Sequence, residues 1–196
     1  DLILDFGVSP QRVHIIHNGV NLAEFQAAEP FPHARPYILA VGSLIFRKGF
    51  DVLLRAYADV PAPKPDLIIA GEGGEEENLK SLARELGIDR NVRFPGLVTG
   101  QTKINLYRSA EFFVCPSRKE PFANVLIEAM AADLPIIASD IDGNMELVQN
   151  EINGLLFPSE NVEALKNALR RMISEKGMQS RMQATLPEKV KPFEWS

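Results

Sequence analysis

Two glutamates in one short stretch of the chain could do chemistry together. Glu120 lies in a loop punctuated by prolines, and Glu128 follows it by eight positions, inside the helix-favouring segment Val125 to Ala132. The apolar run Phe112 to Cys115 precedes this loop, so Glu120 should leave the carboxyl end of a strand, where open α/β sheets bind ligands. Helix formation does not require both acids. Because carboxylates accept hydrogen bonds from hydroxyl groups, the pair indicates a ligand that contains sugar.

The start of the same helix could hold an anion. The backbone N–H groups of Ala123, Asn124 and Val125 would have no partners within the helix, and the positive end of the helix dipole would lie behind them. A phosphate group fits such a position. The alternative interpretation is a capping acid followed by a solvated helical glutamate, with no ligand involved.

A second loop carries cations. Residues Val41 to Gly49, with the sequence VGSLIFRKG, leave an apolar strand and lead into a helix. Gly42 would let a ligand approach the backbone, and Lys48 would project into the same crevice, where an ammonium group neutralises a diphosphate. By themselves, Arg47 and Lys48 would more simply be a solvated pair of loop cations. Their position after a strand favours the binding role instead.

Three other polar patterns are weaker candidates. Gly71-Glu72-Gly73-Gly74 follows a strand, but the acids after it would repel phosphate, so we expect a flexible turn in which Glu72 touches the edge of a ligand. Asp140-Ile141-Asp142 resembles the Asp-x-Asp that binds a divalent ion in some transferases, although aspartate is also common in turns. His14 and His17 lack the spacing of metal ligands. We therefore expect no metal ion and no bound cofactor.

Strand-like and helical segments alternate along the chain. This alternation predicts an α/β fold with a doubly wound, mostly parallel, Rossmann-like sheet that has helices on both faces. The predicted strands are Val13–Ile16, Tyr37–Val41, Leu67–Ala70, Val92–Phe94, Phe112–Cys115, Ile136–Ser139 and Leu155–Phe157.

The bulk composition excludes several classes of function. The chain has 196 residues, of which 45% are hydrophobic, and a net charge of −5. We therefore expect a single globular domain, residues 1–196, that binds no nucleic acid. No apolar run approaches the length of a membrane span, and no signal peptide is apparent. The single cysteine, Cys115, lies in an apolar strand and suits a reducing compartment such as the cytoplasm.

Taken together, these motifs resemble the retaining glycosyltransferase family 4, in particular the C-terminal, donor-binding half of its two-domain GT-B fold. The resemblance implies metal-independent transfer of a hexose from a nucleotide-diphosphate sugar, with retention at the anomeric carbon. It also implies that the leaving phosphate helps to deprotonate a glycan, lipid or small-molecule acceptor, as in polysaccharide biosynthesis. The segments that carry it are Ile16–Asn21, Val41–Gly49, Ile68–Gly73, Val92–Gly96, Pro116–Ala132 and Pro135–Asp140.

The resemblance further implies roles for individual residues. Glu120 would be the catalytic residue and would hold the donor hexose together with the amides of residues 122–124. Glu128 would bind the ribose hydroxyls, while Lys48 and Val125 would meet the diphosphate. The complete set of predicted donor-binding residues is Gly42, Ser43, Arg47, Lys48, Glu72, Leu97, Val98, Glu120, Phe122, Ala123, Asn124, Val125 and Glu128.

The resemblance also suggests how the nucleobase is held, and this chain departs from the family's usual sequence at two positions. Residues 97–98 would frame the base through their backbone. Family members commonly carry arginine where this chain has Ser43, so Arg47 is the candidate for the second cation on the diphosphate. Asp133 stands where a glycine usually ends the helix, which costs about 1 kcal/mol if its backbone is left-handed.

The chain looks like part of a larger protein. An acceptor domain would precede Asp1, and Phe193 and Trp195 resemble the start of a segment that returns to it. The full-length enzyme would be cytoplasmic, either free or peripheral to the cytoplasmic face of a membrane. Two alternatives remain open. One is a sugar-nucleotide epimerase or phosphorylase on the same fold, and the other is a nucleotide-sugar-binding module without transfer activity.

Overall fold

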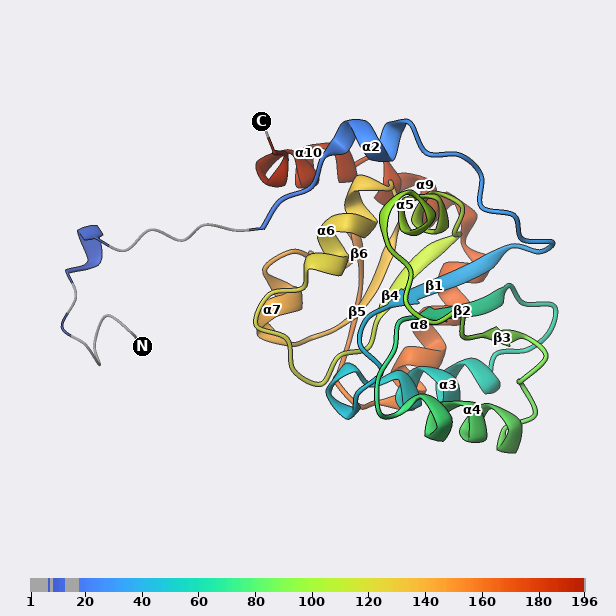
Figure 1. The fold of residues 1–196 in the computed structure, drawn as a ribbon. Helices are drawn as coiled ribbons and strands as arrows, with labels where there is room; N and C mark the ends of the chain where they lie inside the picture. Colours follow the sequence, from blue (N-terminus) through green and yellow to red (C-terminus); the bar gives the residue numbers. More distant parts are fainter. Residues whose placement is uncertain (1–6, 8, 13–17, 196) are drawn as a thin grey trace.

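The computed structural model describes residues 7, 9–12 and 18–195. Within these residues a six-stranded sheet has the order β3-β2-β1-β4-β5-β6, and every neighbouring pair is parallel (Figure 1). The predicted α/β, Rossmann-like sheet is therefore confirmed, whereas the expected strand at 13–16 lies outside the described residues. The strands are β1 (Tyr37–Val41), β2 (Asp66–Ala70), β3 (Val92–Arg93), β4 (Phe112–Cys115), β5 (Ile136–Ser139) and β6 (Gly154–Phe157).

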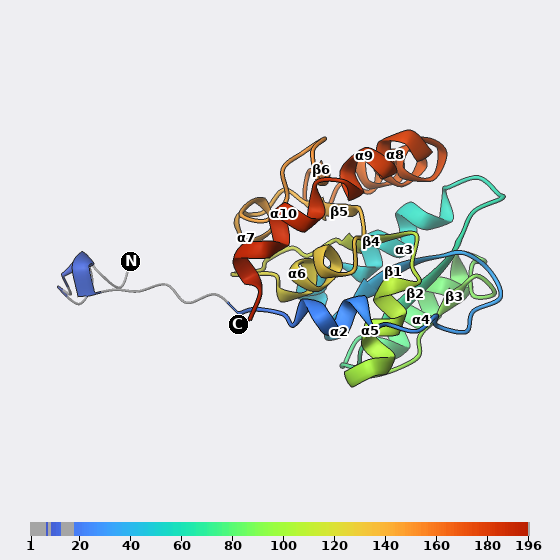
Figure 2. The same ribbon diagram turned by 90° about the horizontal axis from the view of Figure 1, so that it is seen from above.

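Helices cover both faces of the sheet, and each face has its own apolar core (Figures 1 and 2). One face carries α3 (Phe50–Ala58), α4 (Glu76–Glu85), α8 (Val162–Ser174) and α9 (Lys176–Gln183), and the other carries α2 (Leu22–Gln26), α5 (Gly100–Arg108), α6 (Asn124–Ala131) and α10 (Leu186–Val190). Successive strand residues alternate between the cores: Ile38 and Ala40 enter the first, and Leu39 enters the second. Burial on both faces explains why the strands are continuous apolar runs in the sequence.

The segment around Val20 lies beside the segment around Glu194, near the other end of the chain. The amide of Val20 donates to the carbonyl oxygen of Phe193 at 2.8 Å, and the amide of Trp195 donates to that of Val20 at 3.0 Å. A Cβ at Gly19 would lie 2.2 Å from the Trp195 ring, so this contact requires glycine. None of the helices in the described part of the chain is long and apolar enough to cross a membrane.

The backbone just after α6 is left-handed at Asp133, the conformation that the sequence analysis considered for this residue. Asp133 has φ of 57°, a left-handed conformation in which glycine is the usual residue. Its carboxylate accepts a hydrogen bond from Arg108 Nη1 at 2.7 Å, and Arg108 also donates to the carbonyl oxygen of Ala132. Arg108 thus ties the end of α6 to α5.

The direction of winding reverses between β1 and β4. Chain connections lead away from β1 toward β2 and away from β4 toward β5, which leaves a crevice at their carboxyl ends. The loops 42–49 and 116–123 both leave strands at this point. The fold therefore brings the two predicted ligand-binding loops together.

Candidate active site

The loop after β1 is held directly against the loop after β4. It contains the 3-10 turn η2 (Phe46–Lys48), which ends at Gly49 with φ of 67°. A Cβ at Gly49 would lie 2.1 Å from the carbonyl oxygen of Pro116, so no side chain fits there. Glycine is needed for both the left-handed backbone and the close approach.

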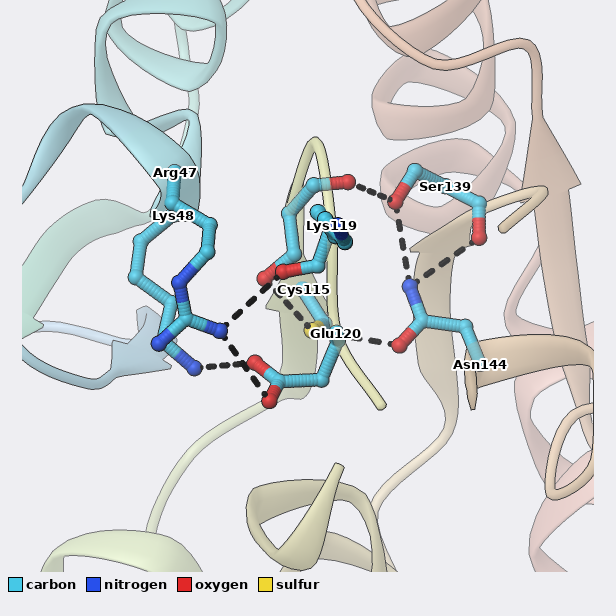
Figure 3. A network of polar contacts seen from close by, with 8 residues as sticks. Arg47, Lys48, Cys115, Lys119, Glu120, Ser139 and Asn144 are labelled. Carbon is cyan, nitrogen blue, oxygen red and sulfur yellow. Dashed lines mark hydrogen bonds and ion pairs between the residues drawn. The ribbon is translucent and has the colours of Figure 1, made fainter. Parts of the chain in front are cut away.

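This approach places two cations on Glu120. Lys48 Nζ forms an ion pair with Glu120 Oε2, and Arg47 Nη1 lies 3.5 Å from Glu120 Oε1 (Figure 3). Arg47 also donates to the carbonyl oxygen of Lys119 at 3.2 Å. The Lys48 and Glu120 side chains are only 13% and 10% exposed, so their charges are weakly screened by solvent.

A buried polar network lies behind Glu120. Ser139 Oγ donates to the carbonyl oxygen of Ser117 at 2.5 Å, and Asn144 Nδ2 donates to Ser139 O and Oγ at 3.0 Å (Figure 3). Cys115 Sγ lies 3.7 Å from both Ser117 Oγ and Asn144 Oδ1. Burial raises the pKa of the Cys115 thiol, so this cysteine is a protonated packing residue, as expected for an apolar strand.

The short helix α7 (Asp142–Met145) supports the same loop from outside the sheet. A Cβ at Gly143 would lie 2.0 Å from the carbonyl oxygen of Glu120. The position of Glu120 is therefore set by elements after β1, β4 and β5.

A cavity of about 330 Å³ lies where β1 and β2 end and α5 and α6 begin. It adjoins the Lys48 side chain, because a Cβ at its lining residue Gly42 would lie 3.5 Å from Lys48 Cε. Leu97, on its rim, is 62% exposed, which leaves apolar surface open to a ligand. The cavity brings together many of the predicted donor-binding residues. Its lining residues are Val41, Gly42, Ser43, Ala70, Gly71, Glu72, Leu97, Val98, Thr99, Lys103, Val125 and Glu128.

Lys103 is a cavity residue that sequence reasoning missed. Its Nζ lies 2.6 Å from Glu128 Oε1, and the two side chains are 30% and 18% exposed. No motif marks Lys103, because it lies on α5 and meets Glu128 only across the cavity. The buried Tyr107 hydroxyl interacts with the Glu128 carboxylate, although it makes no well-formed hydrogen bond among the described residues. Burial and the Glu128 carboxylate raise the pKa of Tyr107 well above its ordinary value.

The remaining predicted residues lie at the start of α6. Asn124 is the first helical residue, and its side-chain oxygen accepts a hydrogen bond from Asn18 Nδ2 at 3.1 Å. Ala123 is the buried N-cap residue, and the Phe122 ring lies 6.1 Å from the Phe193 ring. These residues border the crevice but do not line the cavity described above.

Glu120 lines a second cavity, of about 540 Å³. Its other lining residues are Arg118, Lys119, Pro121, Ile141 and Asp142. This cavity includes Ile141 and Asp142, so it lies on the side of the Glu120 loop that faces α7, and its lining shares no residue with that of the first cavity.

Of the weaker sequence candidates, Glu72 lines the first cavity, whereas Asp140 has a structural role and the two histidines lie outside the described residues. Asp140 accepts a hydrogen bond from the amide of Ser159 at 2.9 Å, as a turn residue does. Among the described residues, no group of three or more histidine, cysteine, aspartate or glutamate side chains is placed to hold a metal ion. His14 and His17 are not described.

Comparison with known proteins identifies the family. Residues 23–188 match the model of the family "Glycosyl transferases group 1". An uncharacterized glycosyltransferase of Methanocaldococcus jannaschii is 34% identical over 185 residues, which are 88% of this chain and 47% of that protein. The chain thus spans about half the length of the curated relatives that it matches.

Solved structures share the fold. Sucrose-phosphate synthase from Thermosynechococcus elongatus has a TM-score of 0.84 at 28% identity, covering 99% of this chain and 52% of that one. HepE of Anabaena, solved in complex with UDP-glucose, has a TM-score of 0.85 at 21% identity, covering 97% and 56% of the two chains. The sheet and its flanking helices are those of the GT-B glycosyltransferases, and the chain belongs to the glycosyltransferases of group 1.

Proposed function

We propose that this chain is the donor-binding domain of a retaining, family 4 glycosyltransferase that transfers a hexose from a nucleotide-diphosphate sugar. The observation that carries the proposal is the crevice between β1 and β4, where Lys48 meets Glu120 beside the cavity that contains Glu128. The UDP-glucose complex of HepE, which has the same fold, supports this class of donor.

The donor would lie across the crevice with its nucleoside in the smaller cavity. The backbone at 97–98 would frame the base, and the carboxylate of Glu128 would accept hydrogen bonds from the ribose hydroxyls. Lys48, Arg47 and the amides at the start of α6 would surround the diphosphate with positive charge. Glu120, which also borders the larger cavity, would hold the hexose.

In the proposed reaction, the bond between the anomeric carbon and the diphosphate oxygen breaks while a bond to the acceptor hydroxyl forms on the same face. The leaving diphosphate takes the proton of that hydroxyl. Lys48 and Arg47 would stabilise the charge that develops on the diphosphate. Because protein cations supply this stabilisation, we propose that donor binding needs no divalent metal, and a chelator should leave the dissociation constant unchanged.

Calorimetry with UDP, GDP, ADP and dTDP tests the proposal. We expect one of these nucleotides to bind, and Lys48→Ala should weaken it by roughly 1.5 to 3 kcal/mol, the range for hydrogen bonds to charged groups. Lys80→Ala is the matched control, because within the described part of the chain the ion pairs of Lys80 are with Glu76 and Glu77, on the surface of α4. An unchanged dissociation constant for Lys48→Ala would refute the diphosphate clamp.

We also propose that the acceptor is held by a domain outside this chain, since the chain covers about half of its relatives. The chain would then bind donor without transferring the sugar, because alignment of donor and acceptor contributes roughly 7 to 11 kcal/mol when complete. Incubation with donor and candidate acceptors, followed by product analysis, tests this. A glycosylated product would show that the chain is sufficient for transfer, and an epimerised sugar or sugar phosphate would favour another enzyme class.

A further inference from the structure

The guanidinium group of Arg118 ties the loops after β1 and β4 together. All three of its nitrogens donate hydrogen bonds. Nε donates to Glu160 at 2.8 Å, and Nη1 and Nη2 each donate to one oxygen of Asp51 at 2.8 Å. Nη1 also donates to the carbonyl oxygen of Phe46 at 2.6 Å. The side chain is only 13% exposed, so this arrangement is held largely out of solvent.

Two further contacts reinforce the same connection. The Cζ atom of Arg118 lies 3.9 Å from the centroid of the Phe46 ring, and the amide of Arg118 donates to the carbonyl oxygen of Arg47 at 2.8 Å. Residues 46 and 47 form the η2 turn from which Lys48 extends, and Glu120 follows Arg118 by two positions. Arg118 therefore joins the backbone segments that carry both members of the Lys48–Glu120 ion pair.

The charge of Arg118 is compensated by two carboxylates of the protein itself. The carboxylates of Asp51 and Glu160 raise the pKa of Arg118 above its ordinary value. Burial raises the pKa of Asp51, but the hydrogen bonds and charge of Arg118 outweigh that effect and leave it below its ordinary value. Turning the guanidinium toward a phosphate would break these charge-assisted bonds, which are stronger than neutral ones.

We propose that Arg118 is a positioning residue for the diphosphate and hexose end of the donor site, and that it acts through Lys48 and Glu120. This inference rests on the proposed donor-binding function. The nucleoside cavity is lined by residues of other loops, including Leu97 and Val98, and does not include Arg118. A change at Arg118 should therefore affect the two ends of the site unequally.

The variant Arg118→Lys tests whether the two ends of the donor site respond differently to a change at Arg118. Lysine keeps the positive charge but lacks the planar fork that binds Asp51 through two parallel bonds. We expect the affinity for UDP, or for the nucleoside diphosphate that binds best in the panel, to fall about tenfold. The affinity for the corresponding nucleoside, measured by NMR titration, should stay within about twofold. Arg171→Lys is the matched control, because Arg171 pairs with Glu151 through both Nη atoms on α8.

A double-mutant cycle identifies the residue through which Arg118 acts. In a Lys48→Ala background, Arg118→Lys should weaken diphosphate binding by less than about twofold, because the group that it positions is already missing. Fully additive losses would overturn the inference. So would an equal loss for nucleoside and nucleoside diphosphate, which would indicate general damage to the fold.

Hydrogen exchange of the free protein tests the inference without a ligand. In Arg118→Lys, amides in residues 44–50 and 116–122 should exchange faster, while those in 97–106 should not change. Unchanged exchange in the first two segments would overturn the positioning role, even if no nucleotide bound. Failure of the unaltered chain to bind any nucleotide would instead refute the proposed function.

Discussion

The two acids of the site are positioned in different ways. Glu120 lies in an irregular loop, where its side chain pairs with Lys48 and Arg47 from the loop after β1 and its carbonyl oxygen packs against Gly143 of α7. Glu128 lies within α6, whose own hydrogen bonds fix its backbone, and among the described residues it forms an ion pair with Lys103. The helix alone fixes the backbone position of Glu128, whereas Glu120 lies in neither a helix nor a strand.

This difference predicts different sensitivities. The Glu120 end should be vulnerable to changes far along the sequence, because groups more than 70 positions away hold it in place. The Glu128 end should respond mainly to changes in Glu128 itself. If the donor lies across both ends as proposed, the affinity for free nucleotide reports on the Glu128 end. The additional affinity for the full nucleotide sugar then reports on the Glu120 end.

Gly143→Ala should have the largest effect. Alanine in a helix is normally favoured over glycine, but here a Cβ would lie 2.0 Å from the Glu120 carbonyl oxygen. We expect the free energy of unfolding to fall by about 3 kcal/mol, the upper part of the range for overpacking. Thermal denaturation measures this loss, and calorimetry should show a greater loss of UDP-glucose affinity than of UDP affinity.

Gly74→Ala is the control for that experiment. A Cβ at Gly74 would meet no atom within 4 Å, so stability and binding should be nearly unchanged. A Gly143→Ala variant as stable as this control would mean that the loop of Glu120 moves freely, and the contrast between the two acids would be lost.

Exchanging each acid for its amide separates the two ends directly. Glu128→Gln should weaken free UDP by roughly 1.5 to 3 kcal/mol, because a charged acceptor for the ribose hydroxyls is lost. Glu120→Gln should spare UDP and weaken only UDP-glucose, since Glu120 would contact the hexose. Calorimetric titrations of both variants with both ligands give the comparison. Equal losses of UDP affinity in the two variants would show that the division of roles is wrong.

Lys103→Met should have a smaller effect. The methionine keeps the length of the side chain but removes the ion pair with Glu128, and partly exposed pairs contribute about 0.2 to 1 kcal/mol. We expect a loss of UDP affinity of a few-fold at most, and nearly unchanged thermal stability. A loss as large as that of Glu128→Gln would mean that Lys103 itself binds the nucleotide strongly.

Tyr107→Phe should change least. The buried hydroxyl is near enough to the Glu128 carboxylate for its pKa to be raised, but it makes no well-formed hydrogen bond among the described residues, so its removal takes away a desolvated polar group and at most a weak contact. We expect the free energy of unfolding to change by less than about 1 kcal/mol and UDP affinity to stay the same. If binding of UDP dropped sharply, the hydroxyl would be supporting Glu128, and the second acid would depend on tertiary contacts as the first one does.

Local patterns in the sequence were sufficient for much of the fold. The limits of β1, β4 and β5 agree with the predicted strands, because strands buried on both faces are short apolar runs bounded by polar loops. The sequence also predicted that Glu120 precedes the start of a helix and that Glu128 lies inside it. Both acids face the crevice region because parallel strands place their carboxyl ends at one edge of the sheet.

Only the tertiary structure decided which side chains meet. Lys103 of α5 contacts Glu128 of α6 across a cavity, and Arg118 of the loop after β4 binds Asp51 of α3, yet neither Lys103 nor Arg118 was among the predicted site residues. Arg47 contacts Glu120 and the carbonyl group of Lys119, and its role as a second cation for the diphosphate stays a prediction. The physical reason is that helix and strand formation depend on neighbours in sequence, whereas ion pairs between distant elements depend on how the sheet orders its strands.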